Sequence, residues 1–201
     1  MNPVFKRIFD IIPKQYHENT FIAGGAAVDL EKALDIDIFV LRIITKHEND
    51  VLKAVIALTP GITFRPEDIP TGMPGVKRHI KSLLKTDSNV DKHFNVIADI
   101  DTRGLLPPIQ IIGSPFLTVY DLLNDFDIST HCVAYGTDGN RHIIPRTTAL
   151  DVPPKIVNSN IPNISISRYR RTCLRYGLRP DPDELVQLCL TPDPSDNEGH
   201  T

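Results

Sequence analysis

Two glycines and two aspartates within residues 20–40 constrain the fold of this chain more than any other feature. The run TFIAGG predicts a buried strand that ends at Gly24 and Gly25, and AAVDLEKAL predicts a short helix. DIDIFVL alternates as a strand does. Glycines at a strand-to-helix turn permit unusual backbone angles and let a ligand approach the main chain closely. We therefore expect a strand, a glycine turn, a helix and a second strand in succession.

The same unit carries the residue types of a phosphate and metal site. The start of a helix after the glycines would present unpaired N–H groups and the positive end of the helix dipole to a phosphate. Asp35 and Asp37 share one face of the second strand, with Cα atoms about 6–7 Å apart. Such carboxylates can reach two Mg²⁺ ions about 4 Å apart, the arrangement used for in-line displacement at phosphorus. The alternative is an ordinary turn followed by a solvated strand face.

The stretches GGAAVDL and DIDIFV resemble the glycine-pair and DxD signature of the DNA polymerase β-like nucleotidyltransferase superfamily, and its small phage members are the most similar. IQIIGSP, LLNDFDISTHCVAY and SRYRRTCLRYGL resemble later landmarks of that group. The resemblance covers about residues 20–180, and the first motif is its specific part. It implies that a nucleoside monophosphate passes from an NTP to a hydroxyl of an RNA 3′ end, a protein or a small molecule. The implied cofactor is Mg²⁺, as two ions, or Mn²⁺.

The resemblance also assigns roles to individual residues of the first motif. Gly24 and Gly25 would contact the triphosphate, and Asp35 and Asp37 would hold Mg²⁺. Asp29 matches an acidic residue that often follows the glycines and is expected near the NTP. The arginine that commonly precedes this acid is a valine in this chain.

A third carboxylate, which the superfamily usually supplies from a later strand, is replaced here. The strand PPIQII has Gln110 in that place, and an amide is a weak metal ligand and a poor base. Asp127, in NDFD, is a candidate third ligand or catalytic base, or else a turn residue. Asp99 and Asp101 form a rival DxD that no glycine pair precedes. Gln110 favours a second hypothesis, a catalytically degenerate fold that binds nucleotide, RNA or protein.

A basic segment follows later in the chain. It contains five arginines and two tyrosines, Arg168, Arg170, Arg171, Arg175, Arg179, Tyr169 and Tyr176. On a helix Arg168, Arg171 and Arg175 recur on one face. Arginine forks suit phosphates and tyrosine rings stack on bases, so we expect this face to bind the NTP or an accepting RNA. The alternative is a solvated face, or one that docks on an acidic surface of a host protein.

The remaining pattern predicts an α/β (α+β) fold, a mixed sheet flanked by helices. Helices are expected at 3–12, 49–58, 75–85, 114–126, 166–178 and 182–190, and further strands at 93–100, 107–113 and within 127–145. We divide the chain into a nucleotidyltransferase-like domain over 1–155, an arginine-rich helical element over 156–190 and a disordered acidic tail over 191–201. A proline-rich loop is expected at 59–75.

Composition excludes several classes of protein. The formal net charge of −3 gives no overall attraction to nucleic acid or to acidic membranes, so any such affinity needs a local patch. The three cysteines form no CxxC, which argues against a disulfide scaffold and against a structural zinc site. No apolar run approaches the roughly 20 residues that span a bilayer. We expect a cytoplasmic protein without a membrane partner, in the host cytoplasm if it is a phage protein.

Overall fold

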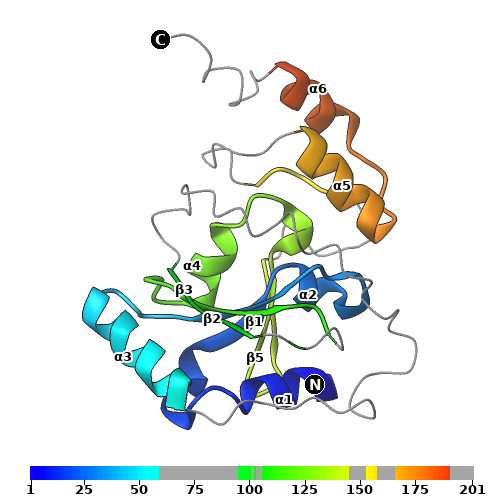
Figure 1. Cartoon of the computed structure of the whole chain (residues 1–201). Coiled ribbons are helices and arrows are strands. Elements are labelled where there is room, and N and C mark those ends of the chain that lie inside the picture. Colours follow the sequence, from blue (N-terminus) through cyan, green and yellow to red (C-terminus); the bar gives the residue numbers. More distant parts are fainter. Residues whose placement is uncertain (59–94, 101, 103–105, 145–152, 158–165, 191–201) are drawn as a thin grey trace, which may run out of the picture.

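A mixed six-stranded sheet forms the centre of the computed structural model, which describes residues 1–58, 95–100, 102, 106–144, 153–157 and 166–190 (Figure 1). The strand order is β3-β4-β2-β1-β5-β6. The strands are β1 (Thr20–Ala23), β2 (Ile36–Val40), β3 (Asn95–Ile100), β4 (Ile109–Gly113), β5 (Val133–Gly136) and β6 (Arg141–Ile143). β2 and β4 are parallel, and the other neighbouring pairs are antiparallel. The expected mixed α/β sheet is therefore confirmed.

The helices cover both faces of this sheet. They are α1 (Pro3–Phe9), α2 (Gly25–Val28), α3 (Lys46–Leu58), α4 (Val119–Asn124), α5 (Ile166–Tyr176) and α6 (Pro182–Leu190). Figure 1 shows α1 and α3 on one side of the sheet, and α4, α5 and α6 on the other. None of the helices in the described part of the chain is long and apolar enough to cross a membrane.

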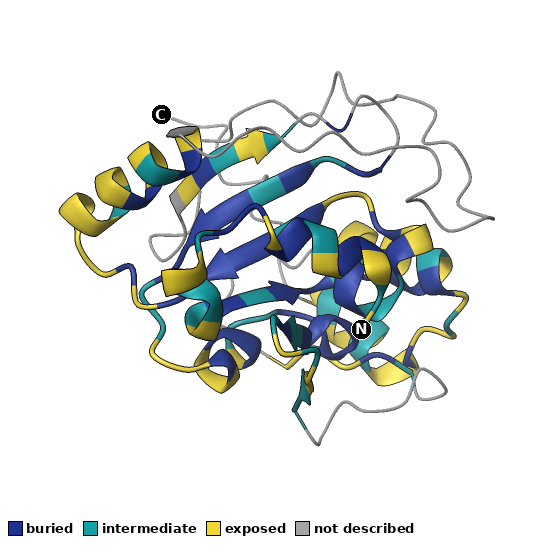
Figure 2. Cartoon of the chain, turned by 90° about the horizontal axis from the view of Figure 1, so that it is seen from below, coloured by how far each residue is buried: buried dark blue, intermediate teal, exposed yellow. Residues whose placement is uncertain are grey.

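Strand alternation in β2 separates two apolar cores. Ile36 and Ile38 face the core that contains α1 and α3. Phe39 faces the second core, which α4 covers with Val119 and Leu122. The central strands are buried along most of their length, as the dark blue segments of Figure 2 show, whereas the helices expose their outer surfaces. Asp37 belongs to the same face as Phe39, so it lies on the α4 side of the sheet.

The connection from β1 to β2 contains less helix than the sequence suggests. The predicted helix over AAVDLEKAL is wrong, because α2 is a single turn followed by a 3₁₀ turn, η2 (Leu30–Lys32). Asp29 interrupts the helix with extended backbone angles, φ −156 and ψ 103. Its side chain then accepts a hydrogen bond from the Glu31 backbone N–H and caps η2. A capping aspartate competes with helical backbone bonds, which explains the break.

Two helices begin at reciprocal caps rather than at the residues expected from the sequence. Thr45 and Glu48 exchange hydrogen bonds at the start of α3, which begins at Lys46, three residues before the expected start at Asn49. Thr118 and Asp121 form a capping box at α4, whereas the helix was expected to begin at the preceding Ser-Pro. Each cap satisfies backbone N–H groups that a helix leaves without partners.

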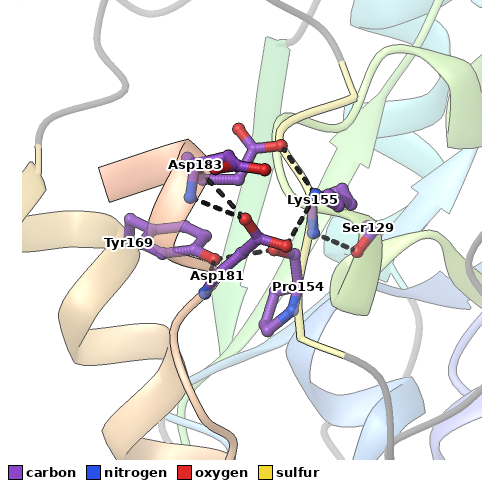
Figure 3. Close-up of polar contacts among 7 residues, drawn as sticks. Ser129, Pro154, Lys155, Tyr169, Asp181 and Asp183 are labelled. Atoms are coloured by element: carbon purple, nitrogen blue, oxygen red, sulfur yellow. Dashed lines mark hydrogen bonds and ion pairs between the residues drawn. The ribbon is translucent and has the colours of Figure 1, made fainter. Parts of the chain in front are cut away.

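The C-terminal helices attach to the sheet domain through a cluster of polar contacts (Figure 3). The Tyr169 hydroxyl donates to the Pro154 carbonyl at 2.7 Å and accepts from the Asp181 N–H at 2.9 Å. The Lys155 ammonium lies 2.6 Å from the Asp181 carboxylate, and the Lys155 N–H donates to the Ser129 hydroxyl. These contacts fix α5 against the strand connections of the core.

Four expectations lie outside the described residues. They are the proline-rich loop at 59–75, the helix at 75–85, the tail at 191–201, and Asp101 of the rival DxD.

Candidate functional site

The glycine turn between β1 and α2 is tightly enclosed. Gly24 has φ 75 and ψ −143, and its N–H donates to the Val133 carbonyl of β5. A Cβ atom at Gly24 would lie 3.3 Å from the Phe126 ring, and one at Gly25 would lie 2.9 Å from the Tyr176 hydroxyl oxygen. That hydroxyl donates to the Gly25 carbonyl at 3.3 Å. Both positions therefore require glycine, and α5 reaches the turn directly.

Helix α2 is only one turn long, so most of the positive charge of the site must come from another element. A helix dipole grows with the number of aligned peptide units, and α2 has only four residues. The start of α2 therefore supplies little of the positive potential that the sequence analysis assigned to it. The arginines of α5 supply fixed positive charge on the same side of the sheet.

Asp35 and Asp37 form an acidic pair at the beginning of β2. Asp35 directly precedes the strand and is exposed, whereas Asp37 is half-buried within it. The surrounding protein raises the pKa of both carboxyl groups by displacing water. The nearby charge of Asp35 raises the pKa of Asp37 further, to about 8. Two like charges in this position favour a bound cation.

Arg175 and Arg168 act on this pair from α5. Their positive charges, Arg175 first, oppose the rise in the pKa of Asp35. These arginines are seven positions apart, nearly two full turns, and so lie on one line along the helix. Arg171 lies about 60° around the helix from that line and is exposed. Two of the three predicted arginines thus act on Asp35.

Asp127 and His131 lie in a buried cluster beneath α5. Asp127 pairs with the Nε of Arg168 at 2.5 Å, and its other oxygen, Oδ1, has no hydrogen-bond partner among the described residues. His131 Nε2 is likewise buried without such a partner. Burial lowers the pKa of His131 to about 4, while the charge of Asp127 opposes this shift and those of Arg168 and Arg175 add to it. The His131 ring meets the Tyr176 ring edge-on at 5.9 Å.

Gln110 links the acidic pair to the rival DxD. It lies in register with Asp37 on β2 and with Asp99 on β3. Its side-chain N–H donates to the Asp99 carboxylate at 2.9 Å. Asp99 is two strands away from Asp37, or about 9–10 Å, which is too far for both to bind one metal ion directly. Asp99 is therefore a neighbour of Gln110 rather than a substitute for the missing carboxylate.

Asp29 has local partners in the structure. Besides capping η2, its carboxylate pairs with Lys32 at 3.3 Å. Its negative charge also raises the pKa of Tyr176, after burial as the main cause, which places Asp29 beside the turn that Tyr176 covers. Asp29 therefore shapes the glycine turn.

The acidic pair has the donor chemistry that Mg²⁺ or Mn²⁺ needs. No group of three or more His, Cys, Asp or Glu side chains suited to a metal ion occurs in the described ranges. Two carboxylates are nevertheless hard oxygen donors, and Mg²⁺ is commonly held by one or two carboxylates together with substrate phosphates. Asp35 and Asp37 fit that pattern, and a cation would relieve their mutual repulsion.

Sequence reasoning missed Tyr176, Phe126 and His131 as parts of the site. Sequence analysis assigns Tyr176 a different role, stacking on a base, and assigns none to Phe126 or His131. The available signal was the spacing from Arg168 to Tyr176, eight residues, which places both on neighbouring faces of one helix. Nothing in the local pattern of Phe126 or His131 indicates the contact with α5.

Replacing Gly24 by alanine is expected to lower the free energy of unfolding by about 1–3 kcal/mol. Its backbone angles belong to a region that only glycine adopts readily, and the new Cβ would press on Phe126. Gly177→Ala is the matched control, since Gly177 also has positive φ but has no described atom within 4 Å of its Cβ position. Chemical denaturation of both variants measures the difference. Equal destabilisation would show that Phe126 accommodates a side chain at the turn.

Comparison of the chain with protein-family models, with curated proteins and with solved structures finds no match.

Proposed function

We propose that this protein is a metal-dependent nucleotidyltransferase of the DNA polymerase β-like kind, which moves a nucleoside monophosphate from an NTP to a hydroxyl acceptor. One observation carries the proposal. Asp35 and Asp37 lie beside a glycine turn, and the charges of Arg175 and Arg168 of α5 act on Asp35. An acidic pair next to positive charge accommodates both a metal ion and the phosphates that accompany it.

In this proposal the acidic residues of the site bind the metal, and the arginines of α5 bind the phosphates. Asp35 and Asp37 hold Mg²⁺ or Mn²⁺, and Arg168 and Arg175 bind the triphosphate through charge-assisted hydrogen bonds. When bound, the metal ions supply stabilisation of the charge that develops on the attacking and leaving oxygens. Gly24 and Gly25 keep the main chain free of side chains where the nucleotide approaches. Gln110 is neutral and takes no proton from the acceptor.

An RNA end matches the surface beside the site better than the other acceptors do. α5 contains four arginines and no acidic residue, in a chain of net charge −3. Arg170 and Arg171 are exposed on this helix, next to the two arginines that act on Asp35. Closely spaced arginines bind a phosphate backbone and release its counterions. A protein or small-molecule acceptor makes less use of this charge.

Gln110 supports a second candidate function, a nucleotide- or RNA-binding module without catalysis. The amide occupies the register position next to Asp37, so β4 supplies no third carboxylate, and Asp99, to which the amide bonds, lies one strand further away. Such a module would retain the arginines and bind nucleotide, and it would have no need of the metal.

Thermal unfolding with each NTP, with and without Mg²⁺, tests the proposal. At one hundred times its dissociation constant, a bound NTP is expected to add about 2.7 kcal/mol to the free energy of unfolding, a rise of roughly 5–10 °C in Tm. The rise should require Mg²⁺ and should disappear in the double variant Asp35→Asn/Asp37→Asn. Asp50→Asn, an exposed residue of α3, is the control and should behave as wild type.

Each other outcome of this experiment is informative. A rise that needs no Mg²⁺ and survives in the double variant would favour the binding module. The absence of any rise with every NTP would contradict a nucleotide site in this protein.

A further inference from the structure

Backbone contacts on both sides of Asp127 fix its position. It follows α4, and its carbonyl accepts the N–H of Val157. The next residue, Ile128, forms an isolated antiparallel bridge with Ile156 and packs against Tyr169 of α5. The carboxylate therefore projects from a fixed point of the core, immediately below α5.

In the ion pair of Asp127 with Arg168, the aspartate side chain is buried and the arginine side chain is half exposed. The Asp127 side chain is 4% exposed, whereas that of Arg168 is 50% exposed. The contact is made through Nε, the nitrogen nearest the aliphatic part of the arginine. A guanidinium has five N–H donors in a planar fork, so a contact through Nε fixes the plane of the outer nitrogens. The Arg168 side chain as a whole is half exposed, so solvent reaches it.

Arg168 pairs with the buried carboxylate and also acts electrostatically on Asp35 of the acidic pair. Its charge acts on Asp35, which places the guanidinium near the edge where a metal-bound phosphate would lie. The charge of Asp127 meanwhile has few compensating contacts. Its Oδ1 has no hydrogen-bond partner in the described ranges, and neither has the neighbouring His131 Nε2. Burial of a carboxylate is costly unless it is paired, so the Arg168 contact dominates the environment of Asp127.

These contacts are poorly suited to a metal ligand or a catalytic base. A base or ligand must reach substrate or metal, and the Asp127 carboxylate is enclosed and engaged with a cation. The same features suit a group that orients another residue.

We propose that Asp127 is a positioning residue, which holds Arg168 by its Nε so that the guanidinium binds a phosphate of the nucleotide beside Asp35 and Asp37. This inference rests on the proposed function, because it assigns the ligand of Arg168 to the same site. It gives Asp127 an effect on nucleotide affinity that passes entirely through Arg168.

A double-mutant cycle on affinity tests the positioning role. The variants are Asp127→Asn, Arg168→Gln and the two combined, titrated by calorimetry with the NTP that stabilises the wild type most and with inorganic tripolyphosphate, both with Mg²⁺. Each single variant is expected to weaken binding about tenfold to a hundredfold. The double variant should bind no more weakly than Arg168→Gln alone, because Asp127 acts only through that arginine.

Two further variants separate positioning from charge and from folding. Arg168→Lys keeps the charge but lacks the fork, and it should lose affinity nearly as far as Arg168→Gln does. Arg141→Gln, at an exposed arginine of β6, should retain wild-type affinity within about threefold. Circular dichroism and Tm confirm folding, and Asp127→Asn/Arg168→Gln should be more stable than Arg168→Gln, which leaves a buried charge unpaired.

The outcomes distinguish this proposal from the proposed function. If the losses from Asp127→Asn and Arg168→Gln multiply, or if Arg168→Lys binds as wild type, the positioning role is wrong although the nucleotide site stands. If tripolyphosphate binds with the predicted pattern and no NTP binds, the positioning role stands and nucleotide transfer is wrong. If wild type binds neither probe, both proposals are overturned.

Discussion

Asp37→Asn is expected to make the metal-free protein more stable and, at the same time, to abolish the proposed nucleotide transfer. The pKa of Asp37 is raised in the folded state, to about 8 from an ordinary 3.8, by burial and by the charge of Asp35. Above pH 4 the unfolded chain loses this proton more readily than the folded protein does. Asp37 therefore lowers the free energy of unfolding progressively as the pH rises from 4 to 8. An asparagine removes that cost.

The expected size of this effect is several degrees in Tm. The shift in pKa corresponds to about 1.4 kcal/mol per unit, which partial hydration of a half-buried group reduces to about 2–4 kcal/mol in total. That stabilisation raises Tm by about 5–10 °C at pH 8 in the presence of a chelator, and by little at pH 4. Transfer should fall by about a thousandfold, since the variant loses a ligand of the metal that stabilises the transition state.

Asp50→Asn serves again as the control, with neither effect expected. A variant that is less stable than wild type at pH 8 without metal would show that Asp37 has a structural role. A variant that is more stable and fully active would contradict the role of Asp37 as a metal ligand, and it would still agree with the raised pKa of this residue.

The stability of the protein is also expected to fall between pH 7 and pH 4 because of His131. Burial lowers the pKa of His131 to about 4 from its ordinary 6.5, so the unfolded chain takes up the proton first as the pH drops. Because of this histidine, the free energy of unfolding is lower by about 2 kcal/mol at pH 5 than at pH 7. Asp127, Arg168, Arg175 and Tyr176 are the ionisable groups around it.

The contribution of His131 is measured as a difference between two pH profiles. Asp37 acts in the opposite direction over the same range, since its raised pKa stabilises the folded state as the pH falls. Wild type and His131→Gln share that contribution, so subtraction of their unfolding free energies isolates the imidazole. The free energy of unfolding of His131→Gln minus that of wild type should increase as the pH falls from 7 to 4. Parallel profiles would mean that the folded state protonates His131 as easily as the unfolded chain does.

Local sequence patterns predicted most strands but placed the starts of α3 and α4 at the wrong residues. β1 and β2 lie where apolar alternation placed them, on either side of the glycine turn. The starts of α3 and α4 depend on reciprocal bonds between residues three apart, Thr45 with Glu48 and Thr118 with Asp121. Both T-x-x-acid spacings are visible in the sequence, so this information was available. The break at Asp29 was likewise open to prediction from its preference for caps.

The acidic side of the site was predictable, and the basic side only in part. Asp35 and Asp37 meet the glycines because a short connection joins two adjacent strands. The contact of Asp127 with Arg168 spans 41 positions, and that of Gly25 with Tyr176 spans 151. Such contacts depend on how α5 docks on the core, which no periodicity within either segment encodes. Helical spacing alone could not tell that Arg175 and Arg168, rather than Arg171, would act on Asp35.

The docking of α5 on the glycine turn also has a consequence for how the molecule is made. A ribosome releases the chain from its N-terminal end, and domains begin to fold as they emerge. The two aspartates of β2 therefore leave the ribosome long before the helix that supplies the opposing arginines and the tyrosine over Gly25. During that interval the acidic edge has no cationic partner from α5. Under the proposed function, a nascent chain shorter than about 176 residues has no complete nucleotide site, so translation itself delays the first binding event.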